Sequence, residues 1–338
     1  MNKLKLAILF GGQSAEHEVS IRSAKNIFEA LDKEKYDPVL IGIDKGGNWH
    51  RADDFFSGGE QIVLVKNEIV NLADPEKRDK IDVVFPVLHG PFGEDGTVQG
   101  LLELANVPFV GAGVLGSAVG MDKDVMKRLL LDAGLPIGKF LVFRRSEKLD
   151  FEEITKELGL PLFIKPANLG SSVGISKARN EEEFLVGARE AFKYDRKIII
   201  EEFIKAREIE VAVLGNDDPI ASIPGEIVVH DDFYAYETKY LDENGATLEI
   251  PAKLSDDQIK KAQELAVKVF KVLECKGLGR VDFFLKENGL PAQAGEFFVN
   301  EINTLPGFTS SSMYPKLWEH GGIKYNELID RLIKLALE

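Results

Sequence analysis

The stretch LKLAILFGGQSAEHEVSIRSAKNIFEAL, residues 4–31, decides how the chain begins to fold. Leu4–Phe10 is a short apolar run ended by Gly11 and Gly12, which is typical of a buried strand. Apolar residues then recur at helical spacing, at Ile21, Ala24, Ile27, Phe28 and Leu31. Ser20 precedes them and is expected to cap this helix. A strand that leads directly into a helix predicts the first unit of a parallel α/β sheet.

The same alternation continues beyond this stretch. Pro38–Ile43 and Ile81–Leu88 are further apolar runs, and Val98, Leu101, Leu102 and Ala105 mark another helix. Strand–helix–strand order favours a Rossmann-like parallel sheet with helices on both faces. We expect this first domain to span residues 1–111.

A glycine-rich segment, Gly111–Gly116, marks the first boundary, and a smaller α+β domain is expected over residues 112–204. Its helices are predicted to begin after Asp122, Asp150 and Asn180, and its strands to lie at Leu162–Lys165 and Lys197–Phe203. A third domain is expected over residues 205–338. Its predicted elements are strands at Arg207–Leu214, Arg280–Lys286 and Phe297–Ile302, a helix capped by Ser255 with Gln258, and a terminal helix from Lys324. Residues 230–250 lack a clear period, and loops of this length are often functional, so a mobile loop is expected there.

Composition excludes several classes of protein. The chain has 338 residues, of which 44% are hydrophobic and 29% charged, as in ordinary globular proteins. Its 42 Lys and Arg against 56 Asp and Glu give a net charge of −14, which makes nucleic acid an unfavourable partner. Cys275 is the only cysteine, so neither an intrachain disulfide nor a cysteine-based zinc cluster can form. The N-terminus is typical of a strand and no apolar run approaches about 18 residues, so we expect a cytoplasmic protein without a membrane partner.

Two polar segments near the C-terminus point to metal chemistry. Side chains alternate along a strand, so Arg280 and Asp282 share one face of theirs, and Glu301 and Asn303 share one face of the next. If the strands are neighbours, two carboxylates and an amide oxygen converge, and this hard oxygen set suits Mg²⁺. A surface strand with polar residues outward remains the alternative from these residues alone.

Other segments are compatible with phosphate or nucleotide binding. Lys165 ends a strand and is followed by a Gly/Ser loop to Gly174, which can hold a polyphosphate but is not a Walker A motif. Glu201 and Glu202 end an apolar strand and need partners, either nucleotide groups or solvent. The loop Gly11–Ser20 lacks the Gly-x-Gly-x-x-Gly of dinucleotide-binding proteins, which disfavours a dehydrogenase. The five histidines are scattered, so a zinc hydrolase is disfavoured as well.

Taken in order, these segments closely resemble the D-alanine–D-alanine ligases, a branch of the ATP-grasp superfamily. The matching pieces are residues 11–20, 89–100, 121–123, 165–174, 207–211, 239–240, 279–282 and 300–307. The resemblance implies a pre-ATP-grasp N-terminal domain, a two-subdomain ATP-grasp fold with ATP between its sheets, and a homodimer. The segment Asn288–Gly295 departs from it by being longer and more apolar than expected.

The resemblance also implies roles for single residues on the nucleotide side. Lys123 and Lys165 would contact ATP phosphates, Lys239 would reach the γ-phosphate, and Glu208 would contact the ribose. The adenine would meet the carboxylate of Glu201 and the backbone of Phe203 and Ile204. The ligands of two Mg²⁺ ions, with Mn²⁺ as an alternative, would be Asp282, Glu301 and Asn303.

On the amino-acid side, Glu16 would hold the ammonium group of a first D-alanine in a network with Ser171 and Tyr240, and His89 would lie near this substrate. The oxyanion would be met by Arg280 and the Gly307 amide, and the second carboxylate by Ser312 and the Met313 amide. The implied reaction joins two D-alanine molecules through an acylphosphate, for peptidoglycan precursors. A D-Ala–D-Ser or depsipeptide ligase and a non-catalytic nucleotide sensor remain rivals. Tyr240 argues against D-lactate, and the intact chemical centre argues against the sensor.

Overall fold

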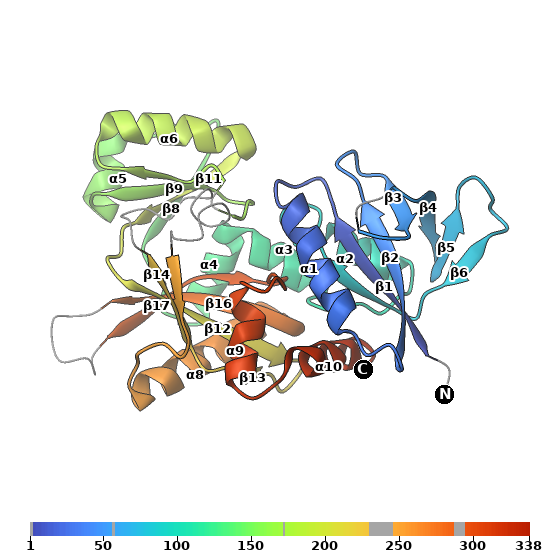
Figure 1. Cartoon of the computed structure of the whole chain (residues 1–338). Coiled ribbons are helices and arrows are strands. Elements are labelled where there is room, and N and C mark those ends of the chain that lie inside the picture. The colour runs from blue at the N-terminus through green and yellow to red at the C-terminus, as the bar shows by residue number, and fades with distance from the viewer. Residues whose placement is uncertain (1–2, 56–57, 172, 230–245, 287–294) are drawn as a thin grey trace.

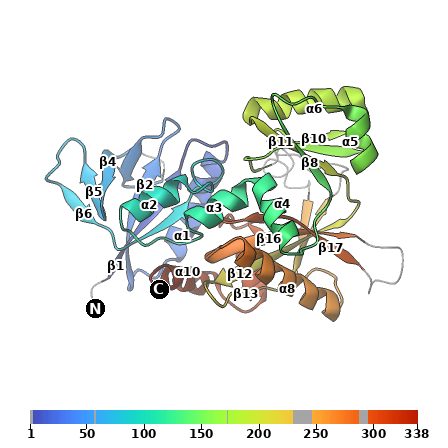
Figure 2. The ribbon, with the colours of Figure 1, turned by 180° about the vertical axis from the view of Figure 1, so that it is seen from behind.

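The computed structural model describes residues 3–55, 58–171, 173–229, 246–286 and 295–338. Three β-sheets and the helices that cover them make up this part of the chain (Figure 1). The sheets follow one another in sequence, the first within residues 4–87, the second within 140–202 and the third within 207–303. Figure 2 shows the same arrangement from behind.

The first sheet has the strand order β6-β5-β4-β3-β2-β1-β7. Strand β1 (Leu4–Gly11) pairs in parallel with β2 (Tyr36–Ile43) and with β7 (Val83–Val87), which confirms the predicted parallel unit. The sheet is extended by antiparallel strands that the sequence analysis missed, β3 (Trp49–Ala52), β4 (Glu60–Val65), β5 (Glu68–Asn71) and β6 (Arg78–Lys80). The sheet is therefore mixed and not wholly parallel.

Helices cover both faces of this sheet, as expected. Leu6 and Ile8 of β1 pack in the hydrophobic cluster that contains residues of α1 (His17–Ala30), whereas Ala7 and Leu9 pack in the cluster that contains residues of α2 (Thr97–Leu104). Successive side chains of a strand point to opposite faces, so the unbroken apolar run of β1 serves both cores. The two views show α1 in front of the sheet in one and α2 in front of it in the other (Figures 1 and 2).

The predicted helix cap at Ser20 is wrong. Helix α1 begins one turn earlier, at His17, and Glu16 occupies the N-cap position. The Ser20 hydroxyl instead accepts the Gly11 N–H at 2.8 Å and donates to the carbonyl of Val87. A serine that satisfies buried backbone groups of two strands has a tertiary role that a local capping pattern cannot reveal. The earlier start brings Glu16 to the carboxyl edge of the sheet.

The second sheet is antiparallel, with the order β10-β9-β11-β8. Its strands are β8 (Phe140–Arg144), β9 (Leu162–Pro166), β10 (Ser176–Ala178) and β11 (Lys197–Glu202). Helices α5 (Phe151–Leu158) and α6 (Glu181–Tyr194) cover its outer face (Figure 1). The predicted caps Asp150 and Asn180 are confirmed, because their side chains accept backbone N–H groups of the first helical turns.

The third sheet runs in the order β15-β14-β12-β16-β17, and β13 pairs with β12. Its strands are β12 (Arg207–Gly215), β13 (Ile220–Ala221), β14 (Gly225–Val229), β15 (Ala246–Glu249), β16 (Gly277–Lys286) and β17 (Glu296–Asn303). Helix α8 (Asp256–Val272) covers one face and begins with the predicted capping box of Ser255 and Gln258. The other face packs on α9 (Met313–His320) and α10 (Tyr325–Ala336), whose residues share a core with β1.

Two helices connect the first sheet to the second, α3 (Val114–Met121) and α4 (Lys123–Asp132). Met126 and Leu130 of α4 pack in the hydrophobic cluster of α8 and the third sheet. The Asp122 side chain caps α4 as predicted, accepting the N–H groups of Asp124 and Val125. The domain limits at residues 111 and 204 stay predictions.

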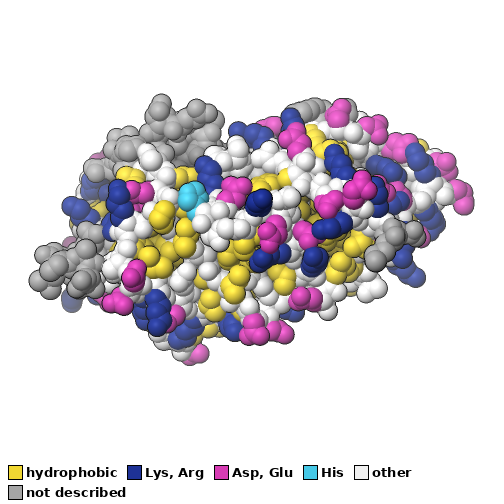
Figure 3. All heavy atoms as spheres, turned by 60° about the horizontal axis from the view of Figure 1, so that its bottom comes forward, with side chains coloured by type: hydrophobic (Ala, Val, Ile, Leu, Met, Phe, Trp, Pro, Cys, Tyr) yellow, Lys and Arg dark blue, Asp and Glu magenta, His cyan; other side chains and the backbone are white. Residues whose placement is uncertain are grey.

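Acidic and basic side chains are interspersed over the face of the molecule seen in Figure 3. Within the described ranges, no helix is both long and apolar enough to cross a membrane. Of the mobile loop expected over 230–250, residues 230–245 lie outside the described residues, as does most of the unusual segment Asn288–Gly295. The end of that prediction is wrong, because Ala246–Glu249 forms β15 and pairs with β14.

Candidate active site

Two adjoining cavities, each of about 440 Å³, lie where the three sheets meet. The first cavity is bounded by the start of α1, the segment around His89, and the end of β17 with the loop that follows it. The second cavity lies between the second and third sheets, against β9, β11, β12 and β16. Residues that line both are Lys123, Gly170, Ser171, Glu210, Ile227 and Glu301.

Buried ion pairs dominate the second cavity. Glu201, at the end of β11, accepts contacts from Lys165 Nζ at 2.6 Å and from Lys127 Nζ at 2.8 Å. The side chains of Lys127, Lys165 and Glu201 are only 4%, 11% and 10% exposed. The cluster of Lys127, Lys165 and Glu201 therefore carries one net positive charge and is screened from water. Its lysines favour an anion nearby, although carboxylates such as Glu208 and Asp282 also line this cavity.

The pKa values of these groups follow from their partners. Burial alone would raise the pKa of the Glu201 carboxyl, but the Lys127 and Lys165 ammonium groups outweigh it and hold that pKa well below its usual range. Burial would likewise lower the pKa of Lys165, and the Glu201 and Glu301 carboxylates raise it instead. Lys165 and Glu201 are therefore both charged at neutral pH.

A second set of buried charges fixes the start of α4. Lys197 Nζ lies 2.7 Å from both Asp122 oxygens and 3.0 Å from Asp124 Oδ2. Lys123, the first residue of the helix, donates through Nζ to the Leu169 carbonyl at 2.7 Å and lies 3.7 Å from a Glu301 oxygen. Lys123 thus joins the Gly/Ser loop after β9 to the Glu301 carboxylate of β17.

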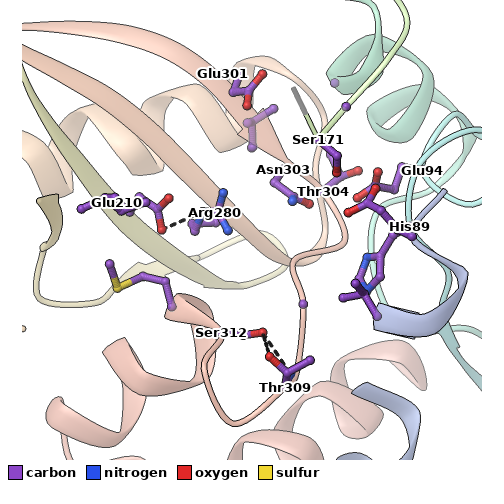
Figure 4. Close-up of a pocket in the computed structure, with 18 of the residues that line it drawn as sticks. His89, Glu94, Ser171, Glu210, Arg280, Glu301, Asn303, Thr304, Thr309 and Ser312 are labelled. Carbon is purple, nitrogen blue, oxygen red and sulfur yellow. Dashed lines mark hydrogen bonds and ion pairs between the residues drawn. The ribbon is translucent and has the colours of Figure 1, made fainter. Parts of the chain in front are cut away.

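The predicted metal residues lie on paired strands, as the sequence analysis required. In the β16–β17 pairing Asp282 faces Glu301 and Arg280 faces Asn303, with a bulge that leaves Asn300 as an extra residue. Arg280 holds both Asp282 oxygens at 2.7 Å, and its Nε lies 3.1 Å from Glu210 Oε2 on β12. Figure 4 shows Glu210 and Arg280 extended toward each other from neighbouring strands. The Asp282 and Glu210 carboxylates raise the pKa of Arg280 against the opposing effect of burial, which is the largest single influence.

The donor set fits Mg²⁺ chemically. Asp282 and Glu301 supply carboxylate oxygens and Asn303 an amide oxygen, all hard ligands, and a phosphate would complete the set. Among the residues that the structure describes, no three or more His, Cys, Asp or Glu side chains are grouped so that they could hold a metal ion by themselves. A cation bound to Asp282 would compete with Arg280 for this carboxylate. Arg280 would still have its ion pair with Glu210.

Glu16, His89 and Glu94 line the far side of the first cavity. His89 is 5% exposed, burial lowers its pKa, and its Nε2 has no hydrogen-bond partner among the described residues. Glu94 Oε2 accepts the Gly90 N–H at 2.7 Å. Burial, followed by the nearby Glu16 carboxylate, raises the pKa of Glu94 to about 8. Figure 4 shows Glu94, Ser171 and His89 on the same side of the cavity.

Neutral hydrogen bonds shape the loop after β17. Ser312 Oγ accepts the Thr309 N–H at 2.9 Å and lies 2.8 Å from Thr309 Oγ1, as Figure 4 shows. A Cβ at Gly307 would lie 2.9 Å from Ser312 Oγ, so a larger residue there would displace this hydroxyl. Helix α9 begins at Met313, and its first N–H groups have no side-chain cap from Ser312. The N-terminus of a helix attracts an anion such as a carboxylate.

The structure brings together every described residue that the sequence analysis singled out. Those lining the first cavity are Glu16, His89, Lys123, Ser171, Arg280, Glu301, Asn303, Gly307, Ser312 and Met313. Those lining the second are Lys123, Lys165, Ser171, Glu201, Phe203, Ile204, Glu208, Asp282 and Glu301. Lys239 and Tyr240 lie outside the described residues. The roles assigned to all these residues stay predictions.

Three residues at the candidate site were missed: Glu94 and Glu210, which line the cavities, and Lys127, which pairs with Glu201 without lining either cavity. Lys127 lies four residues after Lys123, so helical spacing could have placed both on one face of α4. Glu210 lies two residues after Glu208, and strand alternation could have put both at the second cavity. Glu94 belongs to a quoted segment but carried no local signal of burial.

Two family profiles match most of the chain. The profile described as "D-ala D-ala ligase N-terminus" matches residues 5–112, and the one described as "D-ala D-ala ligase C-terminus" matches residues 129–334.

Relatives that match over nearly the whole chain carry the same family name. The chain is 51% identical to the D-alanine–D-alanine ligase of Oceanobacillus iheyensis, with 99% of this chain and 96% of the relative covered. It is 48% identical to D-alanine–D-alanine ligase A of Escherichia coli, with 100% and 97% covered. Among solved structures, the D-alanine–D-alanine ligase of Coxiella burnetii superimposes with a TM-score of 0.87 at 39% identity, covering 99% of this chain and 95% of that one. The VanG D-Ala:D-Ser ligase of Enterococcus faecalis gives 0.89 at 36% identity, covering 99% and 100%.

Proposed function

The chain belongs to the D-alanine–D-alanine ligase family, and from this premise we propose that it joins two D-alanine molecules into D-alanyl-D-alanine. ATP is converted to ADP and phosphate in the reaction, and the dipeptide serves as a peptidoglycan precursor. An acylphosphate of the first D-alanine is the intermediate of this proposal.

The junction of the two cavities carries the proposal. Lys123, Ser171 and Glu301 line both cavities, and Arg280 spans from Asp282 at the second cavity to Glu210, which lines both. A nucleotide in the second cavity and amino acids in the first would meet at these charged groups. Such contact is what transfer of a phosphoryl group from one substrate to another requires.

The second cavity has the chemistry of a nucleotide site. Lys165 and Lys123 would neutralise phosphate oxygens, while Phe163, Phe203 and Phe284 offer aromatic surface to a base. Glu201 and the backbone of Phe203 and Ile204 would bind the adenine, and Glu208 the ribose. The contribution of Lys239 to the γ-phosphate rests on the family resemblance alone.

Asp282, Glu301 and Asn303 would hold two Mg²⁺ ions, with Mn²⁺ as an alternative. When bound, these ions supply neutralisation of the charge on the phosphate oxygens. Arg280 would lose its Asp282 partner when that carboxylate binds a metal ion. Glu210, whose Oε2 lies 3.1 Å from Arg280 Nε, would then hold the guanidinium group in place.

The amino-acid steps follow from the first cavity. Glu16 would bind the ammonium group of the first D-alanine near His89 and Ser171. A carboxylate oxygen of this D-alanine would then attack the γ-phosphorus as ADP departs. The amine of the second D-alanine then attacks the carbonyl carbon, and phosphate departs from it. Arg280 and the Gly307 N–H would stabilise the oxyanion, a contact worth about 3–4 kcal/mol. Ser312 and the N-terminus of α9 at Met313 would hold the second carboxylate.

D-serine as the second substrate is the alternative that a specific observation favours, since the VanG D-Ala:D-Ser ligase superimposes as well as a D-alanine–D-alanine ligase does. ADP release by the purified protein with ATP and Mg²⁺ separates the possibilities. Parallel reactions contain D-alanine, L-alanine, or D-alanine mixed with D-serine or D-lactate, and products are identified by mass. D-alanyl-D-alanine from D-alanine alone supports the proposal. Turnover only with a second amino or hydroxy acid overturns the assigned substrate, and no turnover with any substrate overturns the activity.

A further inference from the structure

The backbone of Phe308, the residue after Gly307, is fixed by three side chains from distant parts of the chain. Its N–H donates to Ser23 Oγ at 3.2 Å. Its carbonyl accepts Asn26 Nδ2 at 3.1 Å and Tyr325 Oη at 2.8 Å. Ser23 and Asn26 belong to α1, and Tyr325 begins α10. Both polar groups of one loop residue are thus satisfied by side chains alone.

The Phe308 ring is fixed as well. It is 1% exposed and packs against the rings of Phe85, Tyr314 and Tyr325, with centroids 5.7, 5.7 and 6.1 Å away. A loop residue held at its N–H, its carbonyl and its side chain has little freedom to shift. The neighbouring peptide is restrained with it.

This restraint reaches the proposed reacting groups through Gly307. A Cβ built on Gly307 would lie 2.9 Å from Ser312 Oγ and 4.0 Å from Ser23 Oγ, so the glycine lies near both hydroxyls. Ser312 in turn is bonded to Thr309, directly after Phe308. The position of the Gly307 N–H and that of the Ser312 hydroxyl therefore depend on the same anchored residue.

Helix α1 also carries Glu16 at its N-cap and Val19 on the cavity wall. Residues 16, 19, 23 and 26 recur at the three- and four-residue spacing of one helical face. One rigid helix therefore positions both the group proposed to bind the first amino acid and the loop proposed to bind the second.

We propose that Ser23, Asn26 and Tyr325 are positioning residues for the second half of the reaction. By anchoring Phe308 they set the Gly307 N–H and Ser312 at the distance from Glu16 at which the second amine meets the activated carbonyl. This inference rests on the proposed function. Small displacements of groups that orient reactants are enough to reduce rates strongly.

The test compares Asn26→Ala, Tyr325→Phe and the double variant with the unmodified protein. We expect each single change to raise the KM of the second D-alanine about fivefold, and the double change about thirtyfold, as loss of one or two hydrogen bonds predicts. The KM of ATP should stay within about twofold, since none of these residues lines the second cavity. The yield of dipeptide per ADP should fall, because the activated intermediate is then lost to water before capture.

Tyr36→Phe is the matched control. The Tyr36 hydroxyl donates to Asp330 of α10 at 2.8 Å, so its loss weakens the contact between α10 and the first sheet without touching Phe308. This control should leave both KM values and the dipeptide yield unchanged. Unchanged second-site KM and yield in the double variant overturn the inference, as does an equal rise in the KM of ATP. If the unmodified protein makes no dipeptide from D-alanine, the proposed function fails, and that result is independent of the variants.

Discussion

The two cavities are built from different chemistry. In the second cavity, position is set by buried ions, with Lys127 and Lys165 on Glu201 at 2.8 and 2.6 Å. In the loop of the first cavity, position is set by neutral groups, with Thr309, Ser312 and the anchors of Phe308 at 2.8–3.2 Å. The charged pairs lie where a polyanion would bind. The neutral contacts lie where two small amino acids would have to meet with correct geometry.

The difference teaches what each region must do when substrates bind. If the proposed function holds, a buried lysine paired with a carboxylate would exchange that partner for a phosphate, so the charged region would reorganise. Breaking such a pair is strongly destabilising because it leaves an unpaired buried charge. A neutral network makes no exchange and can stay as it is. Variants in the charged region should therefore alter stability and nucleotide binding, and variants in the neutral region should alter mainly the use of the second amino acid.

Arg280→Met should have the largest effect, because Arg280 belongs to both regions. The change removes a proposed oxyanion donor and leaves Glu210 and Asp282 facing each other without their cation. We expect the turnover number for dipeptide to fall about 10²–10³-fold, as for loss of an oxyanion-hole donor. Quenched-flow or steady-state measurement of dipeptide checks it. Arg280→Lys, which keeps the charge but not the two-point contact, should recover only part of the rate; full activity of Arg280→Met would remove this residue from the mechanism.

Lys127→Met should destabilise the protein by about 3 kcal/mol, the range found when one partner of a buried ion pair is removed. Glu201 would then keep only Lys165, so the latter would be held back from phosphate and the KM of ATP should rise. Urea unfolding and ATP kinetics measure the two effects. Arg128→Met on the same helix is the control, because the Arg128 side chain is 67% exposed and its buried partner Asp124 keeps Lys197 at 3.0 Å, so stability should change much less. A Lys127 variant as stable as the control, with an unchanged KM of ATP, would show that the pair has no such role.

The sequence predicted the elements whose signals are local. Runs such as Leu4–Phe10 and Lys197–Phe203 and caps such as Asp150 and Asn180 were found where expected. Helix α3 was missed because its glycines resemble a boundary, yet Gly116 is required there by tertiary contact, since a Cβ would lie 2.7 Å from the Glu274 carbonyl oxygen.

The same limit applies to the candidate site. Lys165 and Glu201 were singled out by their position at strand ends, and ordered motifs gave the amino-acid side. Lys127 was missed because a helical lysine is ordinarily solvated, and its burial depends on a partner from another element. The anchors of Phe308 could not be predicted, because Ser23 and Asn26 contact a residue 285 and 282 positions away.

Glu94→Gln tests a titration at the edge of the neutral region. Because the pKa of Glu94 is raised from 4.5 to about 8, the folded protein binds a proton that the unfolded chain has lost in that interval. Stability without ligands should therefore fall as the pH rises from about 5 to 8, by on the order of 1–2 kcal/mol, since Glu94 is half-buried and water screens part of the interaction. Glutamine stays neutral and should flatten that slope in urea unfolding at several pH values. An equal slope in both proteins would place the titration elsewhere.

Thr309→Val should have the smallest effect on activity of these variants. It tests how much the loss of one hydrogen bond in the loop after β17 changes the use of the second D-alanine. The change removes Oγ1, 2.8 Å from Ser312 Oγ, but keeps the Thr309 N–H that donates to the same oxygen at 2.9 Å. Because the loop stays anchored at Phe308, we expect the KM of the second D-alanine to rise only about twofold to fivefold, the loss of about one neutral hydrogen bond. Ser311→Ala, which removes the 3.1 Å contact on the other side of Thr309, is the matched control and should change this KM less. If Thr309→Val impaired dipeptide formation as much as Arg280→Met does, the orientation of the Ser312 hydroxyl, and not the anchored backbone, would control capture of the second amino acid.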